Sequence, residues 1–367
     1  MEPLKNVYNK EFINTFCVTI QQVIPKFDKT LFLNTIFDVD WKSKELKQRM
    51  RHITLALKKQ LPNDYKSMIS IILEIGQQLE KNNVKGQSFE WMFLPEFVEL
   101  YGLGDFKTSI KALETLTQFT SCEFAVRPFI VKYPIKMMEQ MLLWSMHENK
   151  HVRRFASEGC RPRLPWAMAL PALKKDPKSI FPVLENLKND ESEYVRRSVA
   201  NNLNDIAKDN PEMVIKIAKK WIGNTLKTDK LVKHACRTLL KQGNPKIMIL
   251  FGFGSVKNIT ISEFKIQNKN IKSGDYFSFS FLLANLSKLS IKLRLEYAIY
   301  YQKANGSLTK RVYKISEKEY AGKSKIIVER KQSFKPISTR KFHFGLHQIA
   351  IVINGVEFDT HDFYLVN

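Results

Sequence analysis

The sequence has few cysteines and no local cysteine pair. The four of them, Cys17, Cys122, Cys160 and Cys236, lie far apart in a chain of 367 residues. This spacing excludes a Cys-x-x-Cys zinc motif and a short-range disulfide framework, and it is typical of a reducing compartment. The seven histidines show no metal-binding spacing either. We therefore expect neither a metal site nor a cofactor.

Long hydrophobic runs are absent as well. No apolar stretch reaches the ~18 residues that a helix needs to cross a bilayer. The opening residues, MEPLKNVYNKEF, lack the apolar core of a signal peptide. We expect a cytoplasmic protein without a membrane partner. A glycine-rich phosphate loop and a Ser/His/Asp set are also missing, which argues against the enzyme classes that depend on them.

Acidic residues are scarce relative to basic ones. The chain has 59 Lys and Arg against 36 Asp and Glu, a formal net charge of +23. Residues 255–367 hold 19 basic and 9 acidic residues, a net of +10, and the preceding part holds the remaining +13. This excess indicates an anionic partner, which would be nucleic acid, a membrane surface or an acidic protein. Both parts are basic, so either one could face it.

The pattern of apolar residues divides the chain into two domains. Residues 1–250 are rich in helical periodicity, as in DWKSKELKQRMRHITLALKKQL, where apolar residues recur every three or four positions. Residues 255–367 instead alternate apolar and polar residues, as in YFSFSFLLANLS, and Asn354-Gly355 is typical of a tight hairpin. About seven short strands without a helix predict an immunoglobulin-like β-sandwich. The fold class is therefore an all-α domain followed by an all-β domain.

The helical domain contains an internal repeat. Val152 and Val195 are 43 positions apart, and so are Pro134 and Pro177. A third segment, NPEMVIKIAKKWIGNTLKTDKLVKHACRTL, aligns more loosely. This period predicts HEAT-like helix pairs stacked into a solenoid. Each second helix would open on a basic doublet, and the doublets would form one stripe: Arg153-Arg154, Arg196-Arg197 and Lys233-His234. Such a stripe could follow a phosphate backbone, although each doublet alone could equally be a solvated helix face.

The stretch HVRRFASEGCRPRLPW, residues 151–166, combines four arginines with one glutamate, two prolines and a tryptophan. Glu158 lies four residues after Arg154 and three before Arg161, so one helix face could hold all three. The prolines should end the helix and place Trp166 in a loop or at a helix start. Structural alternatives remain for this pattern, because Glu158 could be an intrahelical salt-bridge partner and Trp166 could belong to the core between repeats.

The residues RRFASEGCRPRLPW and VRRSVANNLNDIAKDNP resemble the bacterial AlkC-type DNA alkylation repair glycosylases, which belong with AlkD to the HEAT-like repeat glycosylases. The resemblance covers residues 1–250 and is most specific over residues 120–240. The β-rich part resembles the immunoglobulin-like domain of one AlkC branch. The resemblance implies a monofunctional, monomeric enzyme that acts at the nucleoid. It would hydrolyse the N-glycosidic bond of cationic bases in duplex DNA, with N3-methyladenine the first candidate and N3-methylcytosine the second, without deep base flipping.

The resemblance also assigns roles to individual residues. The catalytic set would be Glu123, Glu158, Trp166 and Asp205. Arg154, Arg161 and Arg163 would hold phosphates around the lesion, and the basic stripe adds four more expected DNA contacts: Arg153, Arg196, Arg197 and Lys233. The chemistry agrees, because a cationic base is already a good leaving group and a carboxylate can stabilise the oxocarbenium-like sugar. In this reading an aromatic face attracts the cation.

Less specific interpretations stay open. Asp205 could be a solvated helix-end residue, and Glu123 could be a first-turn acid favoured by the helix dipole. Trp91, Trp144 and Trp221 are expected in the core, but the apolar segment 88–106 could be a buried helix or could contact the lesion. A non-catalytic HEAT scaffold for nucleic acid or an acidic protein, or an adaptor for RNA or peptides, is the competing function. The sandwich could close around the duplex, which we favour, or tether another protein.

Overall fold

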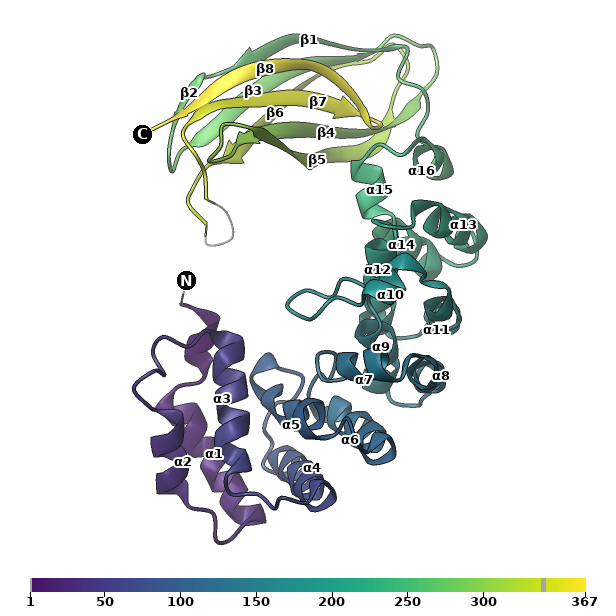
Figure 1. Ribbon diagram of the computed structural model, residues 1–367. Helices are drawn as coiled ribbons and strands as arrows, with labels where there is room; N and C mark the ends of the chain where they lie inside the picture. Colours follow the sequence, from purple (N-terminus) through teal and green to yellow (C-terminus); the bar gives the residue numbers. More distant parts are fainter. Residues whose placement is uncertain (1, 338–340) are drawn as a thin grey trace. The chain divides into compact units, whose positions relative to one another are not determined.

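The computed structural model describes residues 2–337 and 341–367, which pack as two compact units (Figure 1). One unit runs from the N-terminus to Val214 and includes Lys220–Ala235, and the other consists of Ile215–Lys219 and Cys236–Asn367. The helices end at Leu250 and the first strand begins at Ile259. The last two helices therefore pack with the strands, so that the division between the units lies before the end of the helical sequence.

The helices have the following bounds: α1 (Lys10–Val23), α2 (Lys29–Ile36), α3 (Leu46–Lys58), α4 (Tyr65–Lys81), α5 (Phe93–Tyr101), α6 (Phe106–Phe119), α7 (Arg127–Lys132), α8 (Pro134–Trp144), α9 (Lys150–Gly159), α10 (Pro171–Lys175), α11 (Phe181–Leu187), α12 (Glu193–Ile206), α13 (Pro211–Trp221), α14 (Leu226–Ala235), α15 (Arg237–Lys241) and α16 (Pro245–Leu250). Short 3-10 turns cover Leu4–Val7, Phe89–Trp91 and Lys178–Ile180.

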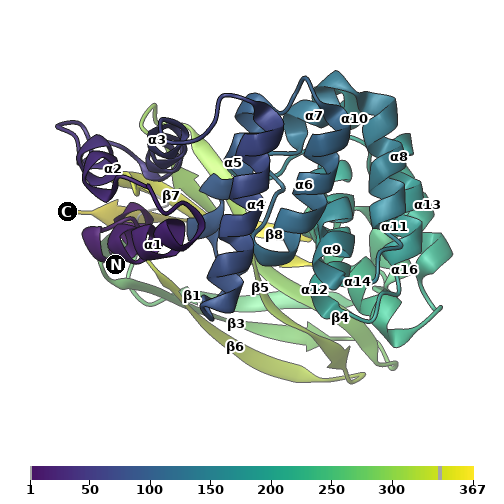
Figure 2. The same ribbon diagram turned by 90° about the horizontal axis from the view of Figure 1, so that it is seen from below.

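Helices in the middle of the chain pack as pairs, α8 with α9 and α11 with α12. The second members lie side by side, because α9 contacts both α6 and α12, and α12 contacts α14 (Figure 2). Val152 and Val195 are both fully buried, and each lies three residues after its N-cap, Asn149 or Ser192. The 43-residue spacing in the sequence thus corresponds to equivalent packing positions.

The third segment does not keep this register. Helix α14 begins at Leu226, so Lys233 lies in its last turn and not in its first. The start is fixed locally, since the Thr225 hydroxyl accepts a hydrogen bond from the Thr228 backbone amide at 3.1 Å. The prediction that this helix opens on Val-Lys-His is wrong, because the capping residue sets where a helix begins and the short basic motif does not.

Two buried tryptophans each donate a hydrogen bond to a glutamate of another helix. The Trp144 indole donates to Glu114 Oε2 at 2.8 Å, and the Trp221 indole donates to Glu185 Oε2 at 2.8 Å. Both rings are almost completely buried, and so is Trp91. The prediction that these three tryptophans belong to the core is confirmed. The segment 88–106 is a short 3-10 turn followed by the largely buried α5.

The described residues of the second unit form eight strands: β1 (Ile259–Ile266), β2 (Asn270–Lys272), β3 (Tyr276–Asn285), β4 (Ile291–Gln302), β5 (Leu308–Tyr320), β6 (Lys325–Ser333), β7 (Gly345–Ile353) and β8 (Val356–Val366). They form a three-stranded sheet, β1-β3-β6, and a five-stranded sheet, β2-β8-β7-β4-β5. Every pair is antiparallel except β2 with β8.

The alternation seen in the sequence buries one face of β3, where Phe277, Phe279 and Phe281 enter the sandwich core. The turn between β7 and β8 has positive φ at both central residues, 47° at Asn354 and 81° at Gly355. This is the tight hairpin that the Asn-Gly pair predicts. Within the described residues, none of the helices combines the length and apolar character that a bilayer crossing requires.

Candidate active site: a buried cluster of carboxylates and arginines

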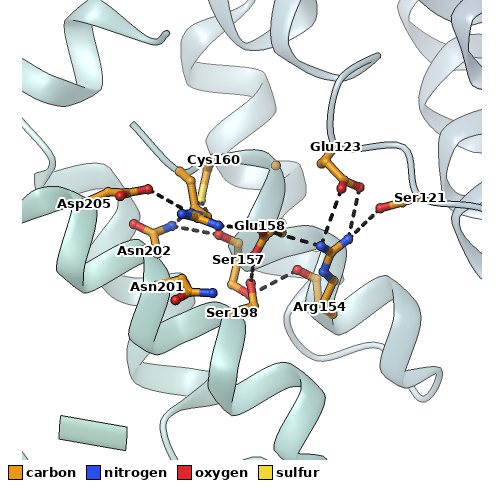
Figure 3. Close-up of polar contacts among 12 residues, drawn as sticks. Ser121, Glu123, Arg154, Ser157, Glu158, Cys160, Ser198, Asn201, Asn202 and Asp205 are labelled. Carbon is orange, nitrogen blue, oxygen red and sulfur yellow. Dashed lines mark hydrogen bonds and ion pairs between the residues drawn. The ribbon is translucent and has the colours of Figure 1, made fainter. Parts of the chain in front are cut away.

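Helix α9 presents Arg154 and Glu158 on one face (Figure 3). Arg161 follows two residues after the end of this helix. The Arg161 Nη1 donates to Glu158 Oε1 at 2.6 Å, and Arg154 Nη2 lies 3.5 Å from the same oxygen. The three residues therefore meet as expected, but the helix face itself carries only Arg154 and Glu158, because α9 ends at Gly159, before Arg161. Glu158 is only 6% exposed, so it differs from a surface salt-bridge partner.

Two further carboxylates join this cluster from other elements. Asp205, near the end of α12, accepts from Arg161 Nε at 2.9 Å. Glu123, in the turn between α6 and α7, accepts from Arg154 Nη1 at 3.0 Å. Each arginine thus bridges two acids, and Glu158 is shared between them. Asp205 is 2% exposed, so the reading as a solvated helix-end residue is wrong, and Glu123 belongs to a turn and not to a first helical turn.

The two guanidinium groups determine the ionisation of this cluster. Burial favours the neutral form of Glu158, but Arg154, Arg161 and the Ser198 hydroxyl more than offset it and lower the pKa of that carboxyl below 4.5. Burial also opposes the charge on Arg154, yet Glu123 and Glu158 raise the pKa of its guanidinium. Burial likewise opposes the charge on Arg161, and Glu158 and Asp205 raise the pKa of its guanidinium. At neutral pH Glu158, Arg154 and Arg161 are therefore ionised.

Trp166 lies in the loop between α9 and α10, and this loop extends away from the helices that carry it (Figure 1). Its side chain is 64% exposed, so its assignment to the core between repeats is wrong. Its backbone has a φ of 63°, a left-handed conformation that is unfavourable for a bulky residue. The loop therefore presents an indole to solvent at an energetic cost.

Comparison with known proteins places the chain in a family. The family model of DNA alkylation repair enzymes matches residues 111–241, and that of the C-terminal immunoglobulin-like domain of the uncharacterised protein YhaZ matches residues 260–367. The Bacillus subtilis (strain 168) protein called uncharacterized protein YhaZ is 43% identical over 99% of both chains. The alkylpurine DNA glycosylase AlkC of Pseudomonas fluorescens, solved with DNA that contains an abasic site analogue, is 33% identical over the whole of both chains, with a TM-score of 0.93. The chain belongs to the AlkC family of DNA alkylation repair enzymes.

Several residues that contact the buried cluster were not predicted from the sequence. Ser198 donates to Glu158 Oε2 at 2.7 Å, and Ser157 donates to Ser198 at 2.7 Å. Asn202 donates to the Ser157 carbonyl at 2.7 Å. Ser198, Asn202 and Asp205 are spaced four and three apart on α12, and this polar stripe on a helix with an otherwise apolar buried face could have identified them.

Five of the arginines predicted to bind DNA make ion pairs within the protein, and four of the five are Arg153, Arg154, Arg161 and Arg163. Arg154 and Arg161 belong to the buried cluster described above. Arg153 donates from Nε and Nη2 to the carboxylate of Asp190, and Arg163 does the same to Asp209. These pairs are bidentate, so the arginine side chains have fixed orientations.

The remaining predicted DNA contacts lie on α12 and α14. Arg196 donates to the carbonyls of Asp190 and Glu191, which precede its own helix. Arg197 is exposed and pairs with Glu193 at 3.2 Å. A surface groove of about 270 Å³ between α12 and α14 is lined by the acidic Glu193 and by several basic residues: Arg196, Arg197, Lys227, Lys230 and His234. Among residues 2–337 and 341–367, no group of three or more His, Cys, Asp or Glu side chains could hold a metal ion.

Proposed function

We propose that the protein is a monofunctional DNA glycosylase that releases cationic N-alkylated bases from duplex DNA, N3-methyladenine first and N3-methylcytosine second. The observation that carries this proposal is the set of three acids, Glu123, Glu158 and Asp205, bound by two arginines in a buried cluster. The full-length similarity to a protein described as an alkylpurine DNA glycosylase supports it.

The chemistry follows from the charge of the damaged base. Alkylation of a ring nitrogen makes the base a good leaving group, so cleavage of the N-glycosidic bond needs no strong acid. The sugar becomes positively charged as the bond breaks, and a fixed carboxylate favours that state. Glu158 suits this role because its lowered pKa keeps it ionised at neutral pH. Water then adds to the sugar carbon, its proton is released, and the base leaves neutral.

Asp205 and Glu123 complete the proposed catalytic set. Each of their oxygens has two lone pairs, so a carboxylate that accepts from Arg161 or Arg154 can also orient a water molecule. Trp166 would contact the cationic base or sugar, an interaction worth about 0.5–2 kcal/mol. A solvent-exposed indole supports a mechanism in which the damaged nucleotide is not turned into a deep pocket. The proposed hydrolysis uses no cofactor.

The helix pairs support a HEAT-like solenoid as the DNA-binding scaffold. Since Arg154 and Arg161 are buried against carboxylates, we infer that they hold Glu158 ionised and contribute to phosphate binding only through their charge. Direct phosphate contacts are proposed for the more accessible cations of the helical unit, which are Arg163, Arg196, Arg197 and Lys233. Arg153 is proposed to support them through its pair with Asp190. The sandwich domain, with its net charge of +10, would add a second DNA contact, and the protein would act as a monomer.

Chromatography of the bases released from methylated duplex DNA tests this function directly. We expect free N3-methyladenine from the wild-type protein. Asp205→Asn should lower the single-turnover rate by about 10²–10³-fold with little change in the Kd for DNA, because the side chain keeps its size. Full activity of this variant would overturn the catalytic assignment. Binding of damaged duplex without any release of base by the wild-type protein would favour the non-catalytic scaffold.

A further inference from the structure

The backbone of Trp166 requires a restraint that its own side chain does not provide. A left-handed φ is unfavourable for tryptophan, and such strain persists only where surrounding contacts hold it. In many proteins burial of the side chain provides that restraint, but this indole is mostly in solvent. The restraint must therefore come from contacts to the backbone of the loop.

The base of the loop is held by a fully buried arginine. Arg127, at the start of α7, donates from Nη1 to the carbonyls of Gly159 and Arg161 at 3.0 and 2.9 Å. Its Nε donates to the Met168 carbonyl at 2.6 Å. These contacts fix both ends of the loop, but they leave the carbonyl of Trp166 to another donor.

That donor comes from a distant helix. Lys47 of α3, 119 positions earlier in the chain, donates from Nζ to the Trp166 carbonyl at 2.9 Å. The same ammonium lies 5.0 Å from the centre of the Phe124 ring, and Phe124 follows Glu123 directly. One cation thus connects the two segments that carry Glu123 and Trp166.

We propose that Lys47 is a positioning residue, whose ammonium holds the Trp166 carbonyl and so keeps the exposed indole in one orientation toward damaged DNA. The expected effect of this positioning on the rate of base release rests on the proposed function. A methionine at this position would fill similar space without donating a hydrogen bond, whereas an arginine could still donate. Lys47→Met and Lys47→Arg are therefore the informative pair, and Lys42→Met removes an equal charge just before the same helix.

Fluorescence can follow Trp166 independently of catalysis. The other four tryptophans, Trp41, Trp91, Trp144 and Trp221, are each 8% exposed or less. Time-resolved anisotropy, taken as the difference from the matching Trp166→Phe protein, reports nanosecond motion of this indole. We expect Lys47→Met to increase the amplitude of that motion roughly twofold, on the scale of one lost hydrogen bond. Lys47→Arg and Lys42→Met should leave it close to that of the wild type.

Base release then distinguishes positioning from DNA binding. Lys47→Met should lower the single-turnover rate about fivefold, a loss that corresponds to about 1 kcal/mol, with the Kd for DNA changed less than twofold. Lys47→Arg should restore most of the rate. An unchanged anisotropy with a raised Kd and a salt dependence reduced by about one phosphate contact would overturn the proposal and make Lys47 a DNA contact. A looser Trp166 in a protein that releases no base would support the positioning and refute the proposed function.

Discussion

Arg161 is the side chain that two of the three carboxylates share. It donates to Glu158 at 2.6 Å and to Asp205 at 2.9 Å, and all three side chains are almost completely buried. Arg161→Gln would keep a hydrogen-bond donor but remove the charge. Loss of one partner from a buried ion pair costs about 3–5 kcal/mol. Because Arg154 and Lys208 still contact the two acids, we expect a destabilisation near the lower end, about 3 kcal/mol.

The size of this effect should depend on pH. In the wild type, the lowered pKa of Glu158 contributes stability that is present above pH 4.5 and lost as the pH falls through the lower, folded-state value. Without Arg161 the folded-state pKa of Glu158 should rise, so the carboxyl can take up a proton when the pH falls. The free-energy deficit of the variant is therefore expected to be largest near neutral pH and smaller near pH 5.

Urea unfolding followed by circular dichroism, at about pH 7 and about pH 5, measures both effects. Arg163→Gln is the matched control, since it breaks a partly exposed pair with Asp209 and should cost less than about 1 kcal/mol. The base-release rate of Arg161→Gln should increase with pH, whereas that of the wild type should stay flat from about pH 6 to 8. A deficit no larger than that of the control, or one that grows in acid, would refute this account of the cluster.

Three further predictions concern other parts of the fold. Arg127→Met should destabilise the helical unit by about 2–4 kcal/mol, because three loop carbonyls lose their buried donor; an unchanged urea midpoint would contradict this. Gly355→Ala should be strongly destabilising in thermal melts, since the new Cβ would lie 2.3 Å from the Gly243 Cα, whereas Gly306→Ala adds backbone strain alone and meets nothing within 4 Å; equal losses would show that the close approach is unimportant. Burial, together with the charge of a neighbouring histidine, lowers the pKa of His347 below 6.5. The stability of the wild type should therefore fall as the pH drops from 6.5 toward this lowered pKa. His347→Phe should remove this part of the pH dependence, and a stability profile identical to that of the wild type would refute the prediction.

The local part of the site could be predicted from the sequence. Arg154 and Glu158 are four residues apart on α9, and the geometry of a helix alone brings such residues to one face. Arg161 follows three residues after Glu158, just beyond the helix, and contacts the same carboxylate. The prolines correctly indicated that Trp166 lies in a loop, although the helix ends at Gly159, before both of them. The Asn-Gly pair also predicted its hairpin locally, because few residues tolerate positive φ at both central positions of such a turn.

The long-range contacts were beyond a reading of the sequence. Glu123 and Arg154 are 31 positions apart, and Arg161 and Asp205 are 44 apart. No local rule specifies which arginine meets which acid, because that depends on how neighbouring helices pack. The expected stripe of basic doublets could not be tested by local spacing either, because neighbouring residues can have different long-range partners. Arg153 pairs with a carboxylate and Arg154 enters the buried cluster, although they are adjacent in the sequence.

By itself the sequence determined the order of a helical and a β-rich part, the excess of positive charge, and the helix face that carries Glu158, because each of these depends on composition or on spacing within a few residues. Only the tertiary structure decided that three acids share two arginines away from water, and that Lys47 and Arg127 hold the loop of Trp166. Burial sets the strength of a charge pair, and it is a property of the packed chain and not of any segment.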